Sequence, residues 1–230
     1  MQIHGLNKTT LLDYPGIVAS TVFTGSCNFR CPFCQNADLV LDPMSQPIIS
    51  EQDVLDHLRK RKGIVKGVCI TGGEPTLQPD LANFIGKIKD IGMLVKLDTN
   101  GYRPEVTESL IKDGLVDYVA MDIKSSLDGY SDICGIDIDT DKIVKSIGLL
   151  INGNNEYEFR TTVVKEYHNA ETFRSIGKLI KGADKYFLQG YIDSDRVLEK
   201  GLSGYERKEL ESFAEIVSEY VKKVNIRGVD

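Results

Sequence analysis

Three cysteines in one short segment are the residues of this sequence best suited to chemistry. Cys27, Cys31 and Cys34 follow the spacing C-x3-C-x2-C. Gly25 and Pro32 mark the segment as a loop rather than a core element. Three thiolates on one loop can bind three irons of a cubane cluster and leave its fourth iron open to a substrate. Zinc is the main alternative, but a structural zinc needs a fourth ligand, so a compact triplet favours iron and sulfide.

The other cysteines and the histidines have no comparable motif around them. Cys69 lies among apolar residues of an expected strand and resembles a small buried hydrophobe. Cys134 falls in an irregular segment, and its role stays open. A zinc site would have to recruit one of these two, or one of His4, His57 and His168.

A glycine-rich turn carries the second candidate site. Gly72, Gly73 and Glu74 precede Pro75 at the end of an expected strand. Glycines let a ligand approach the backbone closely, and Glu74 adds an acceptor. A phosphate-binding loop would continue with Lys and Ser or Thr, which this turn does not do. The turn therefore favours an amino group as its ligand.

Length and charge exclude several classes of protein. The chain has 230 residues, of which 41% are hydrophobic and 27% charged, and these values are typical of one globular domain spanning 1–230. A net charge of −6 with no basic stripe argues against a nucleic-acid partner. No apolar run suggests a membrane span, and the first residues do not resemble a signal peptide. We expect a cytoplasmic protein, whose cysteines serve metal or redox chemistry rather than disulfides.

The elements that must position these residues alternate regularly. Residues 1–17 read as a lead-in, 18–203 as six β–α units, and 204–230 as a C-terminal helix. Such alternation predicts an α/β fold with parallel strands, either a partial (β/α)6 TIM-like barrel or a doubly wound sheet. Strands are expected at 18–24, 68–71, 94–98, 118–123, 157–164 and 186–188, and helices at 50–62, 80–90, 104–112, 141–150, 170–181 and 204–223.

Polar residues recur where each expected strand ends. In both candidate folds the carboxyl ends of parallel strands carry the chemistry. Beyond the two motifs above, the residues at these ends are Asp98, Thr99, Asn100, Asp122, Lys124 and Arg160. Turn formation explains any one of them, but not polar residues at the same end of every strand.

These motifs together resemble the radical S-adenosylmethionine (SAM) superfamily. Cys27-x3-Cys31-x2-Cys34, with the aromatic Phe33, is similar to the hallmark motif of that superfamily. Gly72-Gly73-Glu74 looks like the superfamily's motif for binding the SAM amino group. The resemblance implies the partial barrel. Residues 11–16, 27–36, 98–101 and 122–124 most resemble the activases of glycyl-radical enzymes that serve anaerobic ribonucleoside-triphosphate reductases. Gln35 stands at a position where many members of this group have histidine.

The resemblance also implies cofactors and residue roles. Cys27, Cys31 and Cys34 would hold a [4Fe–4S] cluster, and Gly72, Gly73 and Glu74 the SAM amino group. Phe33 would lie by the adenine and Asn100 by the ribose, while Lys124 and Arg160 offer donors to the carboxylate or ribose. Positions similar to Asp98, Thr99 and Asp122 hold a monovalent cation in some activases. Asp13 and Tyr14 are candidates for reading a partner's glycine loop.

The implied activity is reductive cleavage of SAM, followed by glycyl-radical formation on a partner such as anaerobic ribonucleotide reductase. The family implies a flavodoxin or ferredoxin as electron donor. Two alternatives stay open. One is a radical SAM enzyme that modifies a nucleoside, another small molecule or a different protein. The other is a non-catalytic zinc or iron–sulfur module that binds a partner, against which Glu74, Asp98 and Lys124 argue, because a scaffold needs no SAM pocket.

Overall fold

The computed structural model describes residues 1–229, and the chain forms two compact units. The first unit comprises residues 1–28, 38–99 and 105–120, and the second comprises 29–37, 100–104 and the chain from Met121 onward. Strand β5 (Tyr118–Asp122) begins in the first unit and ends in the second.

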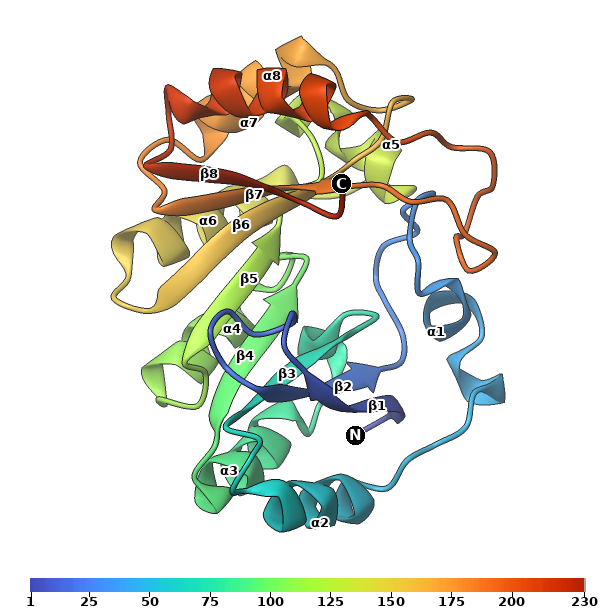
Figure 1. The fold of residues 1–230 in the computed structure, drawn as a ribbon, viewed down its shortest axis with the longest axis vertical. Coiled ribbons are helices and arrows are strands. Elements are labelled where there is room, and N and C mark those ends of the chain that lie inside the picture. Colours follow the sequence, from blue (N-terminus) through green and yellow to red (C-terminus); the bar gives the residue numbers. More distant parts are fainter. Residues whose placement is uncertain (230) are drawn as a thin grey trace. The chain divides into compact units, whose positions relative to one another are not determined.

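The first unit is built on the sheet order β1-β2-β3-β4 followed by the start of β5 (Figure 1). Strands β2 to β4 are parallel, as expected. Helices α2 and α3 pack against one another. The elements are β1 (Ile3–Thr10), β2 (Ala19–Thr24), α1 (Ala37–Leu41), η1 (Pro43–Ser45), α2 (Glu51–Arg61), β3 (Gly67–Gly72), η2 (Pro75–Leu77), α3 (Leu81–Ile91), β4 (Leu94–Thr99) and α4 (Pro104–Lys112).

Helix α2 begins as the sequence predicts. The Ser50 hydroxyl accepts a hydrogen bond from the Asp53 amide at 3.1 Å, which satisfies one amide of the first turn. Val54, Leu55 and Leu58 are buried, and their spacing places them on one face of the helix. The lead-in prediction is wrong, however, because residues 3–10 form β1 and pair antiparallel with β2.

The second unit continues with the end of β5, then β6, β7 and β8 in sequence order. Strands β6 to β8 are parallel. Sequence order within each unit is that of a barrel wall, whereas a doubly wound sheet reverses direction at a switch point. The elements are η3 (Leu127–Gly129), α5 (Tyr130–Cys134), α6 (Thr140–Asn152), β6 (Glu156–Val163), α7 (Ala170–Leu179), β7 (Lys185–Gly190), α8 (Arg207–Ser218) and β8 (Lys223–Arg227).

The C-terminal segment corrects a second prediction. Helix α8 ends at Ser218 instead of continuing to residue 223, and a strand follows it. The helix stops because backbone bonds turn the chain: the Gly182 amide donates to the Tyr220 carbonyl at 2.9 Å, and Lys222 donates to Ala183 at 3.0 Å.

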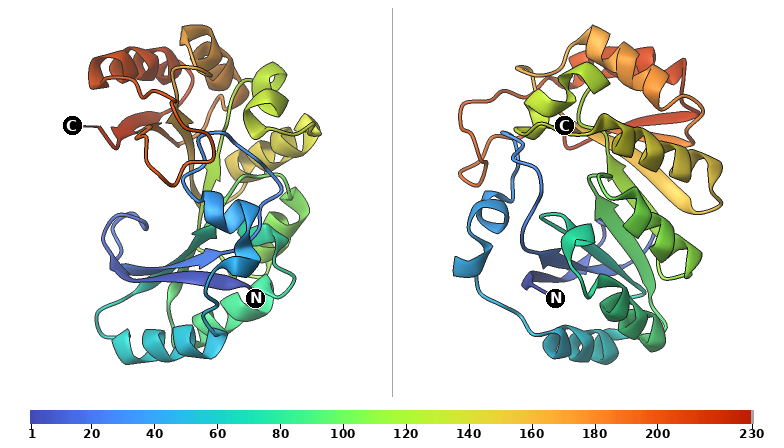
Figure 2. Two further views of the ribbon diagram at one scale, coloured as in Figure 1. Left: turned by 90° about the vertical axis from the view of Figure 1, so that its right-hand side faces the viewer. Right: turned by 180° about the vertical axis from the view of Figure 1, so that it is seen from behind.

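Helix α8 packs beside α7 and along β7 and β8 (Figure 2). The rings of Phe173 and Phe213 stack across α7 and α8, with centroids 4.7 Å apart. In residues 1–229 the chain forms no helix long and apolar enough to cross a membrane.

His168 ties the ends of β5 and β6 together. Its Nε2 lies 2.9 Å from the Lys124 carbonyl, and its Nδ1 accepts from the Val164 amide at 3.0 Å. The ring is 1% exposed, and this burial lowers its pKa below the usual value. The folded protein therefore favours the neutral ring, while the unfolded chain protonates it below pH about 6.5.

Stability should therefore decline as the pH falls from 7 to 5.5, because the unfolded chain binds more protons there. The contribution of one such group is about 1.4 kcal/mol per pH unit at most. Urea unfolding at both pH values measures it. His168→Gln should lose this component, and His57→Gln on α2 serves as the matched control. An unchanged pH dependence in His168→Gln would contradict the assignment.

Candidate functional site

In the first unit the glycine turn after β3 is locked to the loop that leads to Cys27. The Gly73 amide donates to the Thr24 carbonyl and the Glu74 amide to the Ser26 carbonyl, both at 2.8 Å. Gly72 has a φ of +120°, which side chains rarely adopt. The glycines therefore serve this close approach of two loops, and the loop ends one residue before Cys27.

Gly73 leaves no room for a side chain. A Cβ at this position would lie 1.9 Å from the Ser26 carbonyl oxygen. Gly73→Ala should destabilise the protein by about 1–3 kcal/mol or more, as overpacking against backbone does. Gly86→Ala in α3 is the control, because a Cβ there meets nothing within 4 Å and should be stabilising by about 0.5–1 kcal/mol. Equal urea midpoints for the two variants would contradict this.

Glu74 is buried, with 1% of its surface exposed, and its carboxylate is held by hydroxyl and amide donors. Its Oε1 accepts from the Thr76 amide at 3.0 Å, the Thr76 hydroxyl at 2.6 Å and the Thr99 hydroxyl at 2.8 Å. These three donors are neutral groups, and together they hold the carboxylate in one orientation. The arrangement suits a carboxylate prepared for a cationic or amino ligand.

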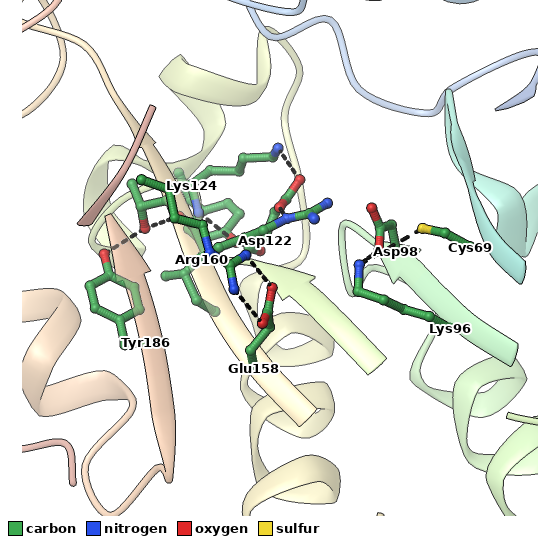
Figure 3. Close-up of polar contacts among 12 residues, drawn as sticks. Cys69, Lys96, Asp98, Asp122, Lys124, Glu158, Arg160 and Tyr186 are labelled. Carbon is green, nitrogen blue, oxygen red and sulfur yellow. Dashed lines mark hydrogen bonds and ion pairs between the residues drawn. The ribbon is translucent and has the colours of Figure 1, made fainter. Parts of the chain in front are cut away.

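A buried ion pair lies on the neighbouring strand. Lys96 and Asp98, two residues apart on β4, point to the same side and form a salt bridge (Figure 3). The Lys96 ammonium also lies 3.8 Å from the Cys69 sulfur. Cys69 is fully buried, as expected, but it contacts a charged group rather than only apolar side chains.

The cysteine triplet is divided between the units, with Cys27 in the first and Cys31 and Cys34 in the second. All three are free thiols. Within the second unit, the Leu198 amide donates to the Cys34 carbonyl at 3.1 Å and the Glu199 amide to the Pro32 carbonyl at 2.8 Å. In residues 1–229 no three His, Cys, Asp or Glu side chains already form a metal site, so the triplet stays a prediction from spacing.

The electrostatics of Cys31 favour the thiolate. A hydrogen bond with Cys134 and the positive charge of Lys124 lower the pKa of Cys31 to about 7, although burial opposes them. Burial raises the pKa of Cys34. A thiolate is the form that binds soft transition metals, so the donor chemistry fits an iron–sulfur cluster.

Asp122 lies between two cations of the second unit. The Lys124 ammonium contacts one carboxylate oxygen at 2.8 Å, and the Arg160 guanidinium pairs with the other (Figure 3). These cations hold the pKa of Asp122 far below its usual value against the effect of burial. The sequence predicted Lys124 and Arg160 as ligand donors, and in the structure both are ion-pair partners of one carboxylate.

Two further candidates of the second unit have local partners. Phe33 is buried, its ring lies 6.3 Å from that of Tyr167, and the Lys124 ammonium lies 5.9 Å from its centroid. The Asn100 side chain accepts from the Tyr102 amide at 3.0 Å, which forms the turn after β4.

Asp13 and Tyr14 lie at the wrong end of the first unit for their predicted role. Tyr14 is a core residue that packs against Ala19 and Tyr118, where β2 and β5 begin. Asp13 accepts a hydrogen bond from Thr21 within β2. Cys27 follows the opposite, carboxyl end of β2, so we do not retain these residues as partner contacts beside the candidate site.

Sequence reasoning missed three residues that organise the site. Thr76 orients Glu74, and Lys96 pairs with Asp98. The sequence did carry a signal for Lys96, because a lysine inside an apolar strand, two residues before Asp98, lies on the same face as that carboxylate. Cys134 was expected in an irregular segment, but it ends α5 and hydrogen-bonds to Cys31, which only the fold reveals.

Comparison with known proteins assigns the family. Residues 21–180 match the model of the radical SAM superfamily. A Methanocaldococcus jannaschii protein, provisionally named a glycyl-radical enzyme activating enzyme, is 34% identical over 99% of this chain and 96% of its own. A Sulfurisphaera tokodaii protein, provisionally named a GTP 3′,8-cyclase, is 30% identical over 89% of this chain and 64% of its own.

The fold has a counterpart among solved structures. SuiB of Streptococcus suis superposes with a TM-score of 0.69 at 17% identity, over 89% of this chain and 47% of that one. The superfamily match covers most of the chain and includes both the cysteine triplet and the glycine turn Gly72–Glu74. The protein is therefore a member of the radical SAM superfamily.

Proposed function

We propose that this protein is an activating enzyme that generates a glycyl radical on a partner enzyme. The observation that carries the proposal is the 34% identity to a protein named as such an activase, which extends over nearly the full length of both chains. An enzyme of 230 residues with five cysteines has a single compact triplet, which suits one cluster and no auxiliary one.

Cys27, Cys31 and Cys34 would hold the [4Fe–4S] cluster that the family implies. Their free thiols and the low pKa of Cys31 support this donor set. With SAM bound, the cluster would supply the electron for reductive SAM cleavage, and the Cα of a partner glycine would be the hydrogen-atom donor. Backbone hydrogen bonds to the carbonyls of Cys34 and of Pro32, the residue after Cys31, hold this part of the loop in place.

Glu74 would bind the SAM amino group. Thr76 and Thr99 keep its carboxylate in one orientation before the ligand arrives, which lowers the entropy cost of binding. The backbone of Gly72 and Gly73 lies beside it. Phe33 and Asn100 would contact the adenine and ribose, and Lys124 and Arg160 would attract the carboxylate.

Side-chain cations would take the place of the monovalent cation that the resemblance implies. Lys96 already neutralises Asp98, and Lys124 and Arg160 neutralise Asp122. Thr99 bonds to Glu74. SAM cleavage should therefore be equal in sodium, potassium and choline buffers at one ionic strength. Stimulation of SAM cleavage by one of the alkali ions would contradict this and would indicate that the site binds a monovalent cation.

The decisive experiment offers the reconstituted protein a glycyl-radical enzyme. The protein is loaded anaerobically with iron and sulfide, reduced, and mixed with SAM and an anaerobic ribonucleoside-triphosphate reductase. We expect 5′-deoxyadenosine and a glycyl-radical signal in electron paramagnetic resonance. SAM cleavage without a radical on any glycyl-radical enzyme would contradict the activase proposal.

A small-molecule radical SAM reaction is the second candidate, favoured by the 30% identity to a protein named a GTP cyclase. Turnover of GTP or another nucleoside in the same assay would identify it. Reduced flavodoxin and reduced ferredoxin, tested in place of dithionite, would identify the electron donor. Zinc in place of iron after reconstitution would contradict both candidates.

A further inference from the structure

Cys134 contacts the candidate cluster loop through its side chain and its backbone. It ends α5 and is fully buried, and its side chain is hydrogen-bonded to that of Cys31. Its carbonyl accepts from the Arg30 amide at 2.7 Å, one residue before Cys31. All of these residues belong to the second unit.

The position of Cys134 is fixed from both ends of α5. At its start, Tyr130 is fully buried, and its hydroxyl accepts from the Lys124 amide at 3.1 Å and donates to the Asp122 carbonyl at 3.3 Å. At its end, Gly135 takes the left-handed conformation, with a φ of +65°. A Cβ on Gly135 would lie 2.7 Å from the Arg30 carbonyl, so the helix end and the loop are in close contact.

This geometry separates Cys134 from the three expected ligands. Cys27, Cys31 and Cys34 come from one loop, whereas Cys134 comes from a different element and meets the sulfur of a ligand. A thiol has one weak S–H donor. A ligand sulfur carries negative charge, which increases when the cluster is reduced. Hydrogen bonds to ligand sulfurs and exclusion of solvent are two of the factors that set cluster potentials.

We propose that Cys134 is a positioning residue that donates its S–H to Cys31 and thereby raises the reduction potential of the cluster. The inference rests on the proposed cluster assignment. By stabilising the added electron, this donor makes the reduced cluster accessible to a weaker electron donor. Cys134 does not bind iron itself, so the fourth iron stays open to SAM.

The test compares midpoint potentials of the reconstituted protein in redox titrations followed by electron paramagnetic resonance. Cys134→Ala removes the donor and should lower the midpoint with full iron content. Cys134→Ser keeps a donor and should restore a midpoint close to that of the wild type. Cys69→Ala, which removes an equally buried thiol from the first unit, should leave the midpoint unchanged.

Three results would overturn the inference. An unchanged midpoint in Cys134→Ala would make Cys134 a packing residue only. Loss of iron in both Cys134→Ala and Cys134→Ser would make it a ligand. A wild type that takes up no iron would remove the cluster assignment itself, which distinguishes that failure from failure of the Cys134 role. If Cys134→Ala does not fold, a midpoint in Cys134→Ser that differs little from wild type supports the donor, and a large fall contradicts it.

Discussion

Replacing any one of Cys27, Cys31 and Cys34 by alanine is expected to abolish cluster assembly and SAM cleavage. Each thiolate would bind a different iron of the cluster, so the two cysteines that remain in each variant would not retain the [4Fe–4S] cluster. The measurement is iron and sulfide per chain after anaerobic reconstitution, followed by 5′-deoxyadenosine formed under dithionite. We expect product at the background level of the assay in all three variants.

Cys69→Ala is the matched control for these variants. Its thiol is buried in β3 and contacts Lys96 rather than a member of the triplet. It should retain full iron and sulfide. Iron loss in this variant, or near-normal SAM cleavage in any one of the triplet variants, would contradict the ligand assignment.

Asp122→Asn is expected to destabilise the second unit strongly. The substitution leaves Lys124 and Arg160 next to each other without the carboxylate that separates them, and both side chains are largely buried. Hydrogen bonds to charged groups contribute about 1.5–3 kcal/mol each, and the loss should be of that size or greater. The midpoint of urea unfolding at pH 7 measures it.

Asp184→Asn is the control, because Asp184 pairs with Lys222 at 2.7 Å on the exposed surface. Its cost should stay below about 1 kcal/mol, as solvent screens such pairs. The pKa of Asp122 is lowered in the folded protein, so its contribution is present above the unfolded pKa of about 3.9 and is lost as the pH falls below it. The two variants should therefore converge in acid, and equal costs at pH 7 would contradict the prediction.

Much of the fold was predictable because its elements are locally encoded. Parallel strands buried on both faces appear as short apolar runs, and helices α2, α3 and α7 have clear apolar faces. Their alternation predicts the α/β architecture. The two strands missed, β1 and β8, lie at the edges of the sheet order, and their residues are more polar.

Whether an edge segment forms a strand depends on the strand it can pair with rather than on its own hydrophobic pattern. Residues 3–10 become a strand because β2 offers an antiparallel partner, and 223–227 because β7 offers a parallel one. Arg227 of β8 also forms a two-point ion pair with the buried Glu158 of β6. No local signal distinguishes such a segment from the continuation of a helix or an irregular lead-in.

The sequence by itself determined the family, because motif chemistry depends on residue types at fixed spacing. Cys27-x3-Cys31-x2-Cys34 and Gly72-Gly73-Glu74 are local features that need no fold to be read. Only the tertiary structure decided which partners these residues have. It paired Arg160 with Asp122, brought the Thr99 hydroxyl to the Glu74 carboxylate and brought Cys134 to Cys31. The physical reason is that side-chain contacts in a barrel wall depend on strand register and on loop closure between segments far apart in the chain.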